Sequence, residues 1–133
     1  MALPQYLTHK PIVETTNYKE KDEIFYNDAT DMVNLSLGYA TFNPKEISAK
    51  VWRQNKNLKF NSQSQELALH RVLDLAILII DNLKVSPIKG AKNIVDVSKR
   101  EEIKKFYEFK TNKNEIDNRI DELLEVINHF KSI

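Results

Sequence analysis

Residues 62–84 read SQSQELALHRVLDLAILIIDNLK, and this stretch decides the fold because apolar side chains occupy nearly every side of it. A helix that is apolar almost all round is typical of a protein core. Ser62, followed by Gln65 three residues later, is a capping signal for the first turn of such a helix. The sequence therefore predicts a core helix over 62–84.

One polar seam interrupts this predicted helix. Glu66, His70 and Asp74 recur at intervals of four residues, which stacks them on one side of a helix, and Arg71 lies beside them. Charged groups next to a core must be paired or must line a cavity, because burying them alone costs several kcal/mol. The seam is therefore an internal ion network, a metal or acid–base site, or part of a binding site.

The chain before this helix is patterned as strands. Residues 34–42 and 46–54 alternate in the period of two that is typical of β-strands, and Asn43-Pro44 breaks the chain between them. A short extended run is expected within 9–18, and residues 58–62 are a candidate fourth strand. Short connections between these segments favour an antiparallel meander.

Two further features mark this region. Residues 20–33 are acidic and show little pattern, so an ordered loop or an irregular edge is expected there. In 46–54 the apolar row Ile47, Ala49 and Val51, which we expect to point inward, continues into Arg53. An arginine that continues an apolar row either reaches outward or faces a partner.

Two more helices are expected after the core helix, over 98–110 and 115–130. The second carries an apolar seam at alternating spacings of four and three, formed by Ile116, Ile120, Leu123, Ile127 and Phe130. This seam must pack on the body of the protein or on a second copy. The predicted fold is α+β in a single domain, 1–133: an antiparallel sheet of three to four strands over 9–61, packed on the buried helix, and a helical pair over 98–131.

Composition excludes several classes of protein. The chain has no cysteine, which rules out disulfides and thiolate sites, and its two glycines cannot build a glycine-rich nucleotide cradle. The N-terminal stretch MALPQYLTHKP does not resemble a secretion signal, and the longest uncharged apolar run is far too short for a membrane span. We expect a cytoplasmic protein with no cofactor, no membrane partner and no motif that names a reaction.

Charge points to a small anionic partner. The net charge of +1 does not favour a long nucleic acid, but residues 45–59 and 84–100 each carry five basic residues and one acidic residue. An arginine fork binds phosphate or carboxylate through two hydrogen bonds, and the first turn of a helix offers further donors. The candidate ligand-binding residues are Arg53, Gln63, Ser64, Glu66, His70, Arg71 and Asp74.

The chain also resembles an uncharacterised family of bacterial and phage proteins classed as a domain of unknown function. The resemblance lies in ISAKVWR (47–53) and in the run from Gln63 to Ile79, with Gln65 and Ala68 as departures from the family pattern, and it spans residues 9–80. It implies a shared fold and site but no activity. In layout alone, with a sheet first and long helices last, the chain is similar to phage Thoeris anti-defence proteins that sequester nucleotide-derived signals.

Three functions follow from these observations. The first is a non-enzymatic protein, expected as a homodimer, that holds an anionic and nucleotide-derived molecule and acts as a phage counter-defence sponge. The second is a metal-assisted or acid–base hydrolase that uses Glu66, His70 and Asp74. The third is a structural interaction module whose 116–130 seam binds a partner chain.

Overall fold

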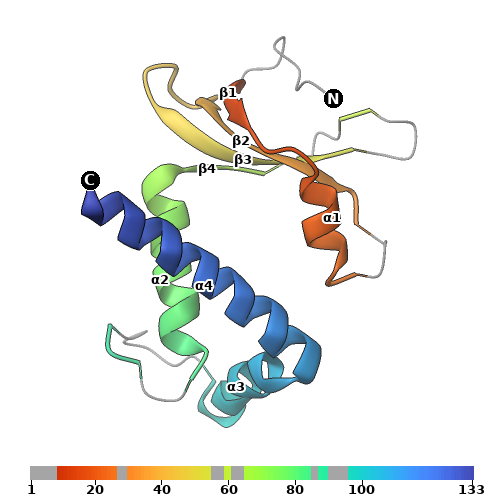
Figure 1. Ribbon diagram of the computed structural model, residues 1–133, viewed down its shortest axis with the longest axis vertical. Coiled ribbons are helices and arrows are strands. Elements are labelled where there is room, and N and C mark those ends of the chain that lie inside the picture. Colours follow the sequence, from red (N-terminus) through yellow and green to blue (C-terminus); the bar gives the residue numbers. More distant parts are fainter. Residues whose placement is uncertain (1–8, 27–29, 55–58, 61–64, 85–86, 90–95) are drawn as a thin grey trace. The chain divides into compact units, whose positions relative to one another are not determined.

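The chain folds into two compact units, Met1–Asp74 and Leu75–Ile133. The structure is a computed structural model that describes residues 9–26, 30–54, 59–60, 65–84, 87–89 and 96–133. Figure 1 shows the helices and strands in chain order. The expectation of one domain over 1–133 stays a prediction.

The first unit contains a four-stranded antiparallel sheet in which strands adjacent in sequence are adjacent in space (Figure 1). Its strands are β1 (Lys10–Glu14), β2 (Met32–Tyr39), β3 (Ile47–Arg53) and β4 (Gln65–Ala68). This meander confirms the predicted α+β class with an N-terminal antiparallel sheet. The acidic segment expected as a loop instead contains a short helix, α1 (Tyr18–Glu23), which contacts β2.

The fourth strand lies later in the chain than expected. Phe60, in the candidate strand 58–62, forms an isolated bridge with Gln54, whereas β4 begins at Gln65. β4 pairs with β3, so that Lys50 lies opposite Glu66. The expected helix start near Ser62 is therefore wrong: α2 spans Leu69–Asn82. Gln65–Ala68 alternates well enough for a strand, and its pairing supplies hydrogen bonds to the edge of β3.

The two faces of the sheet differ in burial. Ser36, Ser48 and Trp52 share the buried face, and the Ser48 and Trp52 side chains have no exposed surface. Side chains one residue away along the strands point to the other face, where Leu37 is 43% exposed. The apolar row Ile47, Ala49 and Val51, expected to point inward, therefore lies on the more open face, with none of the three buried.

α2 differs from the expected core helix in its burial. None of its 14 residues is buried, and Leu73 and Ile77 expose 61% and 53% of their surface. The helix is thus apolar as predicted, but its apolar side chains lie at the surface.

The second unit contains the two helices expected near the C-terminus. A 3-10 turn, η1 (Val97–Lys99), leads into α3 (Arg100–Glu108), and Phe109 connects α3 to α4 (Lys110–Ser132). The buried Tyr107 donates a hydrogen bond of 2.5 Å to Asp117, which ties α3 to α4. Among the helices that the structure describes, none combines the length and the apolar content that crossing a membrane requires.

Candidate functional site

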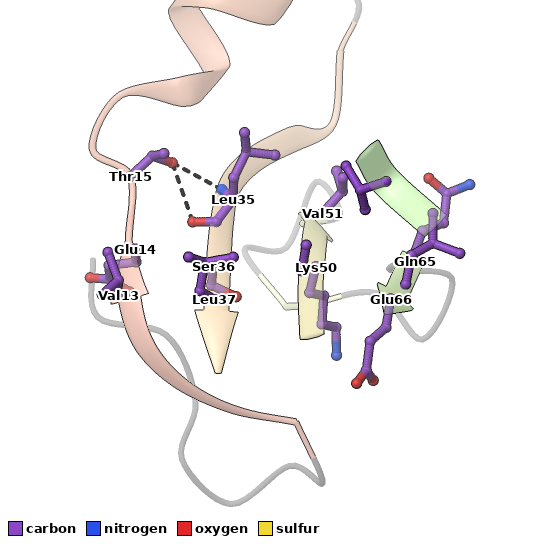
Figure 2. A pocket seen from close by; sticks show the side chains of 13 residues that line it. Val13, Glu14, Thr15, Leu35, Ser36, Leu37, Lys50, Val51, Gln65 and Glu66 are labelled. Carbon is purple, nitrogen blue, oxygen red and sulfur yellow. Dashed lines mark hydrogen bonds between the residues drawn. The ribbon is translucent and has the colours of Figure 1, made fainter. Parts of the chain in front are cut away.

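A hydrophobic hollow of about 850 Å³ lies on the more open face of the sheet (Figure 2). All four strands and the first turn of α2 contribute to it. The lining residues are Val13, Glu14, Thr15, Leu35, Ser36, Leu37, Ala49, Lys50, Val51, Gln65, Glu66, Leu67 and Val72. Its volume falls within the range of small-molecule sites, roughly 300 to 1,000 Å³. No aromatic ring belongs to this lining in the described part of the chain.

Strand register builds the hollow. Leu35 on β2 lies opposite Val51 on β3, and Ala49 lies opposite Leu67 on β4. Directly opposed residues point to the same face of an antiparallel sheet, so these apolar side chains form one continuous surface. In Figure 2 the side chains of Leu35 and Val51 point to one side, whereas Lys50 points to the other.

The surface of the hollow is accessible. Leu67 and Val72 expose 37% and 38% of their surface, and Val13 at the β1 edge exposes 58%. An exposed apolar surface that is concave and contributed by several elements is typical of a binding site.

The opposite face of the sheet carries a buried polar cluster centred on His9. The His9 ring has no exposed surface, and its Nδ1 lies 2.9 Å from Ser48 Oγ and its Nε2 lies 3.0 Å from Ser36 Oγ. Trp52 donates its indole N–H to Ser36 Oγ at 2.8 Å, and its ring meets the His9 ring edge-on at 5.9 Å. Ser48 donates to Glu66 Oε2 at 2.6 Å.

The number of protons available fixes which group donates each hydrogen bond in this network. The single Ser48 proton goes to Glu66, so Ser48 Oγ must accept from His9, which places the imidazole proton on Nδ1. His9 Nε2 then accepts from Ser36, whose oxygen accepts from Trp52. With a neutral His9, each residue of the hydrogen-bond chain from the Trp52 indole to the Glu66 carboxylate has its partner.

Electrostatics agrees with a neutral imidazole beside an ionised carboxylate. Burial lowers the pKa of His9; Glu66 opposes the shift and Lys50 adds to it. Burial raises the pKa of Glu66, but hydrogen bonds from Ser48 and Thr41 outweigh it and hold this pKa below its usual range. Burial also lowers the pKa of Lys50, whose ammonium lies 3.9 Å above the Trp52 ring.

The predicted seam of Glu66, His70 and Asp74 does not exist as one helical face, because Glu66 lies in β4 and the other two residues lie in α2. His70, Arg71 and Asp74 are exposed, and Arg71 immediately precedes Val72 of the hollow. Within the described residues, none of these three has a hydrogen bond or an ion pair. Their part in ligand binding stays a prediction.

The other predicted ligand residues are Arg53, Gln63 and Ser64. Arg53 Nε lies 4.0 Å from Asp31 Oδ1, so a carboxylate of the same chain accompanies its guanidinium. Gln63 and Ser64 lie outside the described residues. Glu66 borders the hollow, but its carboxylate points to the opposite face and bonds Ser48 there, and Arg71 is next in sequence to Val72 of the lining.

Sequence reasoning missed most of the polar cluster. His9 lies near the N-terminus, outside every predicted site, yet it bonds Ser48 across 39 residues of sequence. Ser48 alternates with the row Ile47, Ala49 and Val51, which the sequence predicts to point inward, so the pattern predicts Ser48 on the outer face. No local sequence pattern marks a histidine that is buried against two serines distant in sequence.

The cluster is arranged for structure rather than for catalysis. Ser48, which has a carboxylate and an imidazole as neighbours, is completely buried and gives its proton to Glu66 instead of to His9. A nucleophile needs a base that accepts its proton and a path to the substrate. Within the described residues, no group of three histidine, aspartate or glutamate side chains is arranged to hold a metal ion.

Comparison with known proteins gives a family but no activity. No curated protein and no solved structure matches the chain. A sequence model of a family of unknown function (DUF6530) matches residues 1–87, which include the sheet, the hollow and all of α2. The chain therefore belongs to the DUF6530 family of unknown function.

Proposed function

We propose that this protein is a non-enzymatic binding protein that holds a small amphipathic anion on the hydrophobic face of its sheet. The observation that carries the proposal is the accessible hollow of about 850 Å³ with its apolar lining. Burying apolar ligand surface there contributes about 25 cal/mol for each Å² removed from water. The body of the ligand would lie across Leu35, Val51 and Leu67.

The anionic group of the proposed ligand is inferred from Arg71 in the first turn of α2. Arg71 is exposed and adjoins Val72, which lines the hollow. A guanidinium at the rim of an apolar site favours a carboxylate or a phosphate, because it donates two parallel hydrogen bonds to either group. Gln65, which lines the hollow and is exposed, offers an amide to a polar part of the same ligand.

Other ligand and enzyme hypotheses have less support. A nucleotide base would gain from stacking on an aromatic ring, and the lining described above contains none. The nucleotide-derived ligand and the counter-defence role stay predictions from the sequence. The hydrolase hypothesis needs Glu66 beside His70 and Asp74, whereas Glu66 accepts hydrogen bonds from Ser48 and Thr41 on another element.

Calorimetric titration with decanoate and with 1-decanol tests the proposal. Both ligands share an apolar tail, and only decanoate carries a charge. We expect both to bind with a negative heat-capacity change, which marks apolar burial. Replacement of Arg71 by glutamine should weaken decanoate binding roughly tenfold, which is about 1.4 kcal/mol, and leave 1-decanol unchanged. If decanoate or 1-decanol does not bind the parent protein, the result contradicts the proposed function.

A further inference from the structure

Ala49 lies at the lowest point of the hollow on the more open face of the sheet. It is directly opposite Leu37 on β2 and directly opposite Leu67 on β4, and all three residues line the hollow. Directly opposed side chains share a face, with their Cβ atoms about 4.5 to 5.5 Å apart. A single methyl group between two leucine side chains leaves a dimple whose floor is the Ala49 Cβ.

The dimple is also closed along β3. Ile47 and Val51 lie two residues before and two residues after Ala49, which places both on the same face at about 7 Å along the strand. Both side chains are branched at Cβ. Large apolar side chains therefore surround Ala49 on four sides, and the leucine walls at Leu37 and Leu67 are 43% and 37% exposed.

The spacing of the strands sets the width of the dimple. β2 and β4 each lie about 4.8 Å from β3, so the two leucine walls stand about 10 Å apart, measured between their backbones. A carbon atom midway between them would lie about 5 Å from either strand, within reach of both leucine side chains, whose carbon atoms make contact at about 3.5 to 4.0 Å. The space above Ala49 is therefore the size of one methyl group. A small residue among larger ones accepts a protruding group from the layer that packs on it.

We propose that Ala49 is the specificity-determining residue of the hollow and that its dimple receives a methyl branch of the ligand. The inference rests on the proposed function and narrows the small amphipathic anion to one with a methyl-branched hydrocarbon body. An unbranched chain lying across Leu37 and Leu67 would bridge the dimple and leave the floor without contact. A branch fills it, and burying one further CH₂ group strengthens binding about fourfold.

Two isomeric carboxylates test this preference. Decanoate and 3,7-dimethyloctanoate have the same atoms and the same charge, and only the second is branched. In calorimetric titration of the parent protein, the dissociation constant of the branched isomer should be about fourfold lower. Equal or weaker binding of the branched isomer would overturn the inference about Ala49 and leave the proposed function intact, because that function requires only that decanoate binds. If neither isomer binds, both proposals are wrong.

Enlarging Ala49 tests whether this residue is the source of the preference. Ala49→Leu fills the dimple, so the ratio of the two dissociation constants should fall to about one. Ala76→Leu, which adds the same atoms to α2 outside the lining, should keep the fourfold ratio. The ratio compares two ligands on one variant, so a uniform loss of affinity does not change it. A ratio in Ala49→Leu equal to that of the parent would overturn the inference.

A second variant guards against a folding defect. Circular dichroism of each variant should match that of the parent. Ala49→Val fills part of the dimple with a residue that is favoured in strands, and it should lower the ratio in the same direction. It replaces the leucine variant if that variant does not fold, and an unchanged ratio in the valine variant would then overturn the inference.

Discussion

His9 Nδ1 lies 2.9 Å from Ser48 Oγ, and this contact joins residues 39 positions apart into one buried hydrogen-bond chain. Ser48 passes the chain on to Glu66, and Ser36 connects its other end to Trp52. The network holds three strands and the segment before β1 together on the buried face of the sheet. These hydrogen bonds satisfy the polar side chains on the buried face. The other face of the sheet can therefore consist of apolar side chains that remain open to a ligand.

Ser48→Ala should destabilise the first unit by about 1 to 3 kcal/mol, because it leaves the His9 N–H and the Glu66 carboxylate without the hydroxyl between them. Urea denaturation followed by circular dichroism measures the change. Ser132→Ala, which removes an exposed hydroxyl at the end of α4, is the matched control and should have little effect. Equal stability of the two variants would show that the buried chain contributes nothing.

Stability should fall as the pH drops below about 6.5, the ordinary pKa of histidine. The pKa of His9 is lower in the folded protein, so the unfolded chain binds more protons in the window between the two values, and acid favours unfolding there. The fall in unfolding free energy between pH 7.5 and 5.5 measures the effect. His9→Gln should be less stable at every pH but should lose most of this slope. An unchanged slope in that variant would exclude His9 as its source.

A second loss of stability should appear below about pH 4.5. The pKa of Glu66 is lowered in the folded state, so its contribution is present above the unfolded value and disappears as the pH falls through the folded value. Glu66→Gln should remove this component from the acid limb of the pH profile. A variant whose acid limb matches that of the parent would contradict the role assigned to the carboxylate.

Gly38→Ala should destabilise the sheet by roughly 1 to 3 kcal/mol. A Cβ at this position would lie 2.1 Å from the carbonyl oxygen of Lys10, so β1 would have to move away from β2. The thermal midpoint should drop by several degrees. Ala49→Gly, on the neighbouring strand, controls for a change of one methyl group without overpacking. A midpoint for Gly38→Ala equal to that of the parent would show that β1 is not held in this register.

Trp52 is the only tryptophan and has no exposed surface, so the intrinsic fluorescence reports on the buried face of the sheet. We expect emission at short wavelength and weak quenching by acrylamide in the folded protein. Both properties should change on unfolding. Strong quenching in the native state would place the indole in water and contradict its bond to Ser36.

The sequence predicts those parts of the fold that rest on local pattern. Alternation on either side of Asn43-Pro44 predicts β2 and β3, and the backbone N–H of Lys45 bonds the Asn43 side chain in that turn. The apolar seam from Ile116 to Phe130 predicts α4.

Parts that rest on distant contacts escaped prediction. Residues 65–68 fit a strand as well as a helix, and pairing with β3 decides between them. The pattern of β3 predicts its apolar row on the buried face, whereas Ser48 and Trp52 are buried there, because no local pattern relates the serines to their partner His9. Because the polar side chains occupy the buried face, the apolar row on β3 faces outward and contributes to the hollow.

Two adjacent residues of β1 provide the most direct test of the hollow. Val13 and Ile12 each expose 58% of their surface, but only Val13 belongs to the lining. Val13→Asp should weaken decanoate binding at least about tenfold, because a charge then faces the apolar tail, whereas Ile12→Asp should bind as the parent does. Equal binding by the two variants would contradict the assignment of the ligand to this face of the sheet.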